Sequence, residues 1–192
     1  MQGADSFAVL MQSEVAAGDP EEAAGNSADL LKAVEEALVE KGITNTAVEQ
    51  IDAAFDSEGN TAGYVITAAN SEGYGGAVEL MCGISADEEG ALTIEGISFL
   101  TLTETAGMGM RAKEAAFTDQ FPGKVVRSGE ALAYTKDGAS ADNEIDAISG
   151  CTVTTSAVTK DINAALEAVR TALEFPITAA DTDAGREGSD ES

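Results

Sequence analysis

The feature that most restricts the fold is a stretch between residues 48 and 102 whose apolar positions follow a two-residue period. Apolar or alternating segments lie at 61–67, 77–84 and 91–97, and turn-forming sequences precede them at 56–60, 73–76 and 87–90. Alternation is typical of strands with one buried face, and Gly/Asn/Asp-rich turns join neighbouring antiparallel strands. We therefore predict a meander of antiparallel strands.

Two segments have the three- and four-residue spacing of amphipathic helices. The first follows Ser27, a possible N-cap, and stops at Gly42. The second covers 157–173, and its apolar positions are Val158, Ile162, Ala165, Leu166, Val169 and Leu173. A short helix is expected over 111–117, and 128–134 remains unassigned. These elements predict an α+β fold, with an antiparallel or mixed β-sheet flanked by helices.

The chain of 192 residues fits one domain with short appendages. Residues 1–27 are acidic and predicted to be loosely ordered, 28–176 form the domain, and 177–192 form a disordered acidic tail. No apolar run approaches the roughly 20 residues that cross a bilayer, and the start of the chain lacks the pattern of a signal peptide.

Charge and residue usage exclude several classes of protein. The chain has 35 Asp and Glu against 10 Lys and Arg, a net charge of −25, so a nucleic-acid partner is excluded. It has no histidine, which excludes Ser-His-Asp triads and His-ligated zinc. Cys82 and Cys151 are too few for a four-thiolate metal site, and they could form one bridge or two free thiols.

Two short motifs resemble known ligand-binding sequences, but their spacing or surroundings do not fit such sites. The acidic clusters at 87–90 and 181–185 lack the spacing of a calcium-binding EF-hand loop, so no metal site is predicted. Residues 107–112 match the G-x-G-x-x-A spacing of a dinucleotide-binding turn, but that turn requires a parallel sheet and a long following helix. The glycines would still allow main-chain amides to approach an anionic or planar ligand.

The stretch 146–156 is rich in small and hydroxyl side chains and leads directly into the second helix. A helix N-terminus suits phosphate, because its main-chain amides lack partners and the helix dipole is positive there. Hydroxyls are carried by Ser149, Thr152, Thr154 and Thr155, although one side chain is enough to cap a helix. From composition alone, capping and phosphate binding both remain open.

Within this stretch, Asp146, Ser149, Gly150 and Thr152 resemble the flavinylation motif D-x-x-[S/T]-G-A-T, with Cys151 in place of the usual Ala. The motif belongs to the FMN-binding domain shared by the G subunit of Rnf complexes and the C subunit of sodium-pumping NADH:quinone oxidoreductases. The resemblance implies that Thr152 carries FMN through a covalent phosphoester. It also implies that a flavin transferase forms this bond from FAD and recognises Asp146.

Further matches follow in the order expected of the Rnf G subunit. Residues 104–109 are similar to the family loop E-T-P-G-L-G, with Ala106 for Pro and Met108 for Leu. Other similar segments lie at 4–7, 73–76, 117–121 and 144–149, so the resemblance covers nearly the whole chain except the tail. It implies an FMN-binding domain type of α+β fold.

The resemblance also implies which residues contact the cofactor. These are Thr152, Ser149, Gly150, Cys151, Thr154, Glu104, Thr105, Gly107, Met108, Gly109 and Tyr74. The loop 107–109 would lie along the isoalloxazine ring, Met108 would be an apolar contact, and Glu104 or Thr105 would bond polar flavin edges. Tyr74 would line the site or simply cover a strand edge. No residue of the chain is predicted to be catalytic, since the flavin supplies the redox chemistry.

The implied function is that of an electron-transfer flavoprotein subunit of an Rnf-type ion-translocating ferredoxin:NAD oxidoreductase, which is not a complete enzyme alone. Its implied partners are the other subunits of a membrane redox complex and the flavin transferase. Its implied location is the outer face of the cytoplasmic membrane, through an N-terminal anchor that is absent from this chain. Alternatives are the C subunit of the sodium-pumping enzyme, a stand-alone extracellular flavinylated carrier, or a cofactor-free acidic binding or structural domain.

Overall fold

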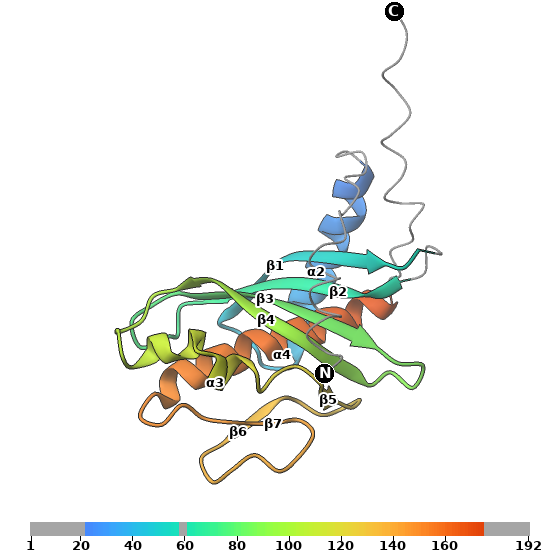
Figure 1. Cartoon of the computed structure of the whole chain (residues 1–192). Helices are drawn as coiled ribbons and strands as arrows, with labels where there is room; N and C mark the ends of the chain where they lie inside the picture. The colour runs from blue at the N-terminus through green and yellow to red at the C-terminus, as the bar shows by residue number, and fades with distance from the viewer. Residues whose placement is uncertain (1–21, 58–60, 175–192) are drawn as a thin grey trace, which may run out of the picture.

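The computed structural model describes residues 22–57 and 61–174, and it describes side chains from residue 29 onward (Figure 1). Its main element is a five-stranded antiparallel sheet in the order β1-β2-β3-β4-β5. The strands are β1 (Thr46–Phe55), β2 (Thr61–Asn70), β3 (Val78–Ala86), β4 (Leu92–Leu102) and β5 (Lys124–Val126). The predicted α+β fold with an antiparallel sheet is therefore confirmed.

One face of this sheet forms the hydrophobic core. In the β2–β3 pair, Ile66 lies opposite Cys82 and Ala68 opposite Leu80, and all four side chains are fully buried. Successive strand residues point to opposite faces, so every second residue of β2 and β3 joins the core. The two-residue period of the sequence therefore becomes one continuous apolar face.

Two long helices pack on the sheet. Helix α4 (Thr152–Glu174) packs across β1, β2 and β3, and α2 (Glu22–Glu40) packs against both α4 and β1 (Figure 1). The apolar positions predicted for the second helix are buried from Val158 to Val169, whereas Leu173 remains 42% exposed near its end. The amphipathic pattern therefore identified the packed face of α4 correctly.

Both long helices begin earlier than the sequence predicts. Helix α2 begins at Glu22, so Ser27 lies inside it, and the chain leaves the helix at Gly42, whose φ is +75°. Helix α4 begins at Thr152, five residues before the predicted start at 157. Thr and Val favour strands, so local propensity does not predict a helical first turn at 152–155.

The remaining elements connect β4 to α4. They are a 3₁₀ helix η1 (Gly109–Lys113), α3 (Ala115–Thr118), and two short parallel strands, β6 (Ala133–Thr135) and β7 (Glu144–Asp146). The predicted helix at 111–117 is thus divided into two single turns, and the unassigned segment 128–134 ends in β6. Strand β7 delivers the chain to the loop that precedes α4.

Several expectations concern the ends of the chain and the cysteines. The predicted loose segment lies mostly outside the described residues, and the acidic tail lies wholly outside them. Within the described part, every helix is too short or too polar to cross a membrane. Cys82 and Cys151 are both buried free thiols, and burial raises the pKa of Cys82.

Candidate functional site

A tight turn places Thr152 at the beginning of α4. The main-chain N–H of Cys151 donates to the carbonyl of Ile148 at 2.9 Å, and Gly150 has a φ of +78°, which a residue with a Cβ adopts only with strain. The hydroxyl of Thr155 accepts from the N–H of Ile148 at 3.1 Å and donates to the Cys151 carbonyl at 3.0 Å. Thr155 thus holds the turn from inside the helix.

The hydroxyls of Ser149, Thr152, Thr154 and Thr155 divide into two pairs. Thr155 holds the turn, and the buried Thr154 donates to Glu104 Oε1 at 2.8 Å. Within residues 22–57 and 61–174, the hydroxyls of Ser149 and Thr152 have no hydrogen-bond partner. Thr152 is partly exposed, so its hydroxyl is available to react or to bind a ligand.

Glu104 ties the loop 73–76 to the first turn of α4. Its Oε1 accepts from the Tyr74 N–H at 2.9 Å as well as from Thr154, and its Oε2 accepts from the Gly75 N–H at 3.2 Å. Both carboxylate oxygens therefore have protein donors. That Glu104 or Thr105 bonds a flavin edge stays a prediction, and the exposed Thr105 has the freer side chain.

Glycine is required where the main chain approaches this carboxylate. A Cβ on Gly109 would lie 2.5 Å from both Cδ and Oε2 of Glu104, and a Cβ on Gly75 would overlap the carbonyl oxygen of Thr103. At Gly107 the requirement is conformational, because its φ is +74°. The glycines of the 73–76 and 107–109 segments thus permit close packing around Glu104.

We expect Gly109→Ala to lower the free energy of unfolding by about 1–3 kcal/mol, because the new methyl group displaces a carboxylate that accepts three hydrogen bonds. Urea unfolding measures the change. In a Glu104→Ala background, where the obstructing carboxylate is gone, the same substitution should cost much less. Equal costs in the two backgrounds would show that Glu104 is not the cause.

Next to these residues lies a pocket of about 300 Å³, within the usual size range of ligand sites. Its lining residues are Tyr74, Glu104, Thr105, Met108, Gly109, Gly150, Cys151, Thr152, Val153 and Thr154. The structure thus brings together every predicted cofactor residue except Ser149 and Gly107. Val153 was missed, and its place between two predicted residues was the only signal for it.

The rim of this pocket is apolar and unusually exposed. Tyr74 is 74% exposed, and Met108 and Val153 are each 48% exposed. Exposed apolar side chains gathered at a pocket mark a ligand site more often than single ones do. An apolar rim above a free hydroxyl and the first amides of α4 fits a planar ring system that carries a phosphate.

Asp146 and Ser149 lie on the other side of the turn. With Arg111 they line a separate hollow of about 350 Å³. The main chain of Asp146 is held by Gln120, which accepts from its N–H at 2.7 Å, and its carboxylate accepts from the Ala139 N–H at 2.7 Å. The structure therefore separates these two motif residues from the pocket that Thr152 lines.

A third hollow, of about 390 Å³, lies further along α4 and shares Thr152 and Val153 with the pocket. Its other lining residues are Glu72, Tyr134, Ser156, Ala157 and Lys160. The sequence pattern did not indicate this hollow, because its residues come from three separate elements and loops.

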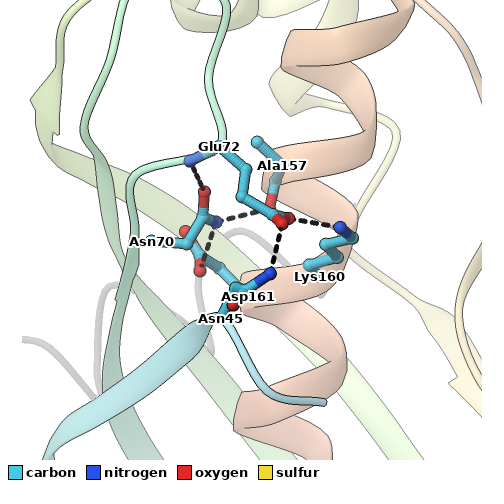
Figure 2. Close-up of polar contacts among 6 residues, drawn as sticks. All are labelled: Asn45, Asn70, Glu72, Ala157, Lys160 and Asp161. Carbon is cyan, nitrogen blue, oxygen red and sulfur yellow. Dashed lines mark hydrogen bonds and ion pairs between the residues drawn. The ribbon is translucent and has the colours of Figure 1, made fainter. Parts of the chain in front are cut away.

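A polar cluster borders the third hollow, where β2 ends beside α4 (Figure 2). Asn70 donates to the carbonyl of Ala157 at 2.9 Å and to Asp161 Oδ1 at 2.7 Å, and it accepts from the Glu72 N–H at 2.8 Å. The Glu72 carboxylate pairs with Lys160 and accepts from Asn45 at 2.7 Å. Asp161 is fully buried, and its Oδ2 has no partner among the described residues.

Comparison with known families identifies the class of domain that this fold and pocket form. Residues 73–167 match the family model described as the FMN-binding domain. This segment contains the loop 73–76, the Glu104 loop, the Thr152 turn and most of α4. This segment of the chain is therefore similar to the FMN-binding domain family.

Two curated relatives of the chain are subunits of redox complexes. The chain is 37% identical over 113 residues to the G subunit of the Na⁺-translocating ferredoxin:NAD⁺ oxidoreductase complex of Acetobacterium woodii, over 58% of this chain and 51% of the relative. It is also 37% identical over 111 residues to the G subunit of the proton-translocating complex of Clostridium ljungdahlii, over 58% of this chain and 55% of the relative. It is thus homologous to the G subunits of these Rnf-type complexes, and it spans about half the length of both relatives.

A solved structure supports the fold independently. NqrC of Shewanella oneidensis superposes with a TM-score of 0.50 at 18% identity, over 65% of this chain and 59% of that one. At this identity the similarity concerns the fold alone. The predicted FMN-binding domain type of fold is therefore confirmed.

Proposed function

We propose that this domain carries FMN covalently on Thr152 and transfers electrons as part of an Rnf-type ion-translocating ferredoxin:NAD oxidoreductase. The observation that carries the proposal is the Thr152 hydroxyl, which is free of protein partners among the described residues and lines the pocket of an FMN-binding domain. The sequence relatives favour the Rnf G subunit over the C subunit of the sodium-pumping enzyme, because the solved NqrC structure supports only the fold.

The attachment step we propose is a phosphoryl transfer. The Thr152 oxygen attacks the phosphorus of FAD that bears the ribityl group, and a Thr152 O–P bond forms. The bond from that phosphorus to the bridging oxygen breaks, AMP leaves, and the hydroxyl proton passes to a base of the flavin transferase. No electron is transferred in this step. The exposed hollow beside Asp146 leaves that motif residue accessible to the transferase.

The residues of the pocket have distinct tasks in this proposal. FMN supplies the electron-transfer chemistry when bound. The N–H groups of the first turn of α4 lack intrahelical acceptors, since Thr155 N–H makes the first such bond, to Cys151, and they suit the phosphate. Tyr74, Met108 and Val153 supply apolar surface for the ring, and Glu104 holds the two loops in position.

We further propose that the domain works with the other subunits of a membrane redox complex, on the outer face of the cytoplasmic membrane. A covalent bond suits that location, because a cofactor lost there could not be replaced from a cytoplasmic pool. The charge of −25 keeps such an exposed domain soluble.

Treatment of the purified chain with a flavin transferase and FAD tests the central proposal. We expect a yellow adduct that survives denaturation, with a mass gain of one FMN minus one water. Peptide mapping should locate it on Thr152. If the chain stayed colourless and unmodified while a known acceptor protein was modified in parallel, the cofactor-free alternative would replace this proposal.

A further inference from the structure

Resting on the proposed attachment of FMN at Thr152, we propose that Lys160 is the positioning residue for the flavin phosphate. In the structure, Lys160 pairs with Glu72. On flavin binding, its ammonium group exchanges this carboxylate for the phosphate, and Ser156 offers its hydroxyl to the same ligand. The third hollow thus becomes the polar part of the flavin site.

Three polar residues of α4 follow one another at intervals of about one helical turn. Thr152, Ser156 and Lys160 are four residues apart and lie on one helix face, and all three line the third hollow. Side chains in a helix lean toward its N-terminus, so Lys160 leans toward Thr152. Their Cα atoms are separated by about 12 Å along the axis, which the lysine side chain and a phosphate on Thr152 can span together.

The charged side chains around Thr152 are mostly acidic. Thr152 lines both the pocket of about 300 Å³ and the third hollow. Among the described residues that line these two spaces, Lys160 is the only Lys or Arg, whereas Glu72 and Glu104 are acidic. A phosphoester would add a further negative charge beside two carboxylates in a chain of net charge −25. A single cation within reach would therefore have a large influence on how well this site accepts phosphate.

The surroundings of Glu72 allow the exchange. The Lys160 and Glu72 side chains are 47% and 28% exposed, and an ion pair this exposed contributes little stability. When Lys160 leaves, the carboxylate still accepts from Asn45 at 2.7 Å, and the Glu72 N–H remains bonded to Asn70 (Figure 2). The hydrogen bond from Lys160 is the main interaction that lowers the pKa of Glu72, and the bond from Asn45 comes second. Phosphate binding should therefore raise that pKa.

The test compares FMN with riboflavin, which lacks only the phosphate. Dissociation constants are measured by quenching of flavin fluorescence with the full chain, Lys160→Gln, Glu72→Gln and the control Lys32→Gln, an exposed lysine on α2. We expect Lys160→Gln to weaken FMN binding about tenfold and to leave riboflavin binding unchanged. Glu72→Gln should tighten FMN binding a few-fold because it releases Lys160, and the control should change neither.

Opposite effects of the two pair variants distinguish this proposal from a structural role. If the ion pair merely stabilised the fold, Lys160→Gln and Glu72→Gln would weaken both flavins alike, and that result would overturn the proposal. Unchanged FMN binding in Lys160→Gln would also overturn it. Thermal unfolding of each variant confirms that it is folded.

A second readout serves if free flavin binds too weakly to measure. The initial rate of covalent attachment by the transferase should be about tenfold lower for Lys160→Gln than for Lys32→Gln, and equal rates would contradict the proposal. Failure of the wild-type chain to accept FMN would refute the proposed function. Attachment at Thr152 with no influence of Lys160 would refute only the present inference.

Discussion

Replacing Thr152 by alanine should abolish the covalent attachment of FMN completely, with no mass gain after treatment with the transferase and FAD. Among the described residues that line the pocket, Thr152 has a hydroxyl without a protein partner at the first position of α4, whereas the Thr154 hydroxyl donates to Glu104. Alanine also favours helix, so the fold should survive, with a stability change of about 1 kcal/mol or less.

Two matched variants complete this experiment. Thr152→Ser keeps a hydroxyl at the same position and should still accept FMN. Thr154→Ala removes a bond to Glu104 and should reduce stability by about 1 kcal/mol, yet it should still be modified at Thr152. A Thr152→Ala protein that remained yellow after denaturation would disprove the assignment of the attachment site.

Replacing Asp161 by asparagine should stabilise the domain by about 2–4 kcal/mol at pH 8 and by much less at pH 5. Burial raises the pKa of Asp161 to about 7, the Asn70 hydrogen bond opposes this, and the charges of Glu72 and Glu49 add to the increase. The Oδ2 atom has no partner among the described residues, so the ionised form is poorly accommodated. Asparagine has nearly the shape of the carboxyl group and, like the protonated acid, carries no charge.

The direction of the pH dependence follows from the two pKa values. An unfolded chain releases this proton near pH 4, whereas the folded chain keeps it until about pH 7. Because the folded state binds the extra proton, the free energy of unfolding falls as pH rises through this window and then levels off above pH 7. At about 1.4 kcal/mol per pH unit between the two pKa values, this contribution reaches about 4 kcal/mol at most.

Urea unfolding between pH 5 and pH 8 measures this effect while staying above the isoelectric point of about 4.1. The quantity of interest is the stability of Asp161→Asn minus that of the wild type, which should increase with pH. Asp119→Asn makes the same change of charge at an exposed position and should show no such trend. A constant difference for Asp161→Asn across this range would mean that Asp161 titrates normally.

Some elements of the fold could be predicted from the sequence and others could not. The strands of the meander and the buried face of α4 could be predicted, because a two-residue or 3.6-residue period reflects which side of an element faces the core. The start of α4 at Thr152 could not be predicted, because its first turn consists of β-branched residues that favour strands by themselves. The hydrogen bonds of Thr155 to the preceding turn stabilise that helical start.

The candidate site, like the fold, could be predicted only in part from the sequence. The motif residues around Thr152 and the glycines of 107–109 could be selected from the sequence, and most of them line one pocket. The separate roles of these residues could not be predicted from the sequence. A contact of Glu104 with the flavin stays a prediction, and only the structure shows that its carboxylate accepts from donors 29, 30 and 50 residues away in the chain.

The sequence by itself determined the antiparallel sheet, the apolar face of the last helix, and the resemblance to the FMN-binding domain family. These properties depend on neighbouring residues and on motifs in order along the chain. Only the tertiary structure decided which hydroxyls of the motif are free of partners among the described residues, and that Lys160 pairs with Glu72, 88 residues away. Such contacts depend on strand register and on the position of α4 against the sheet, and no local pattern in the chain encodes either.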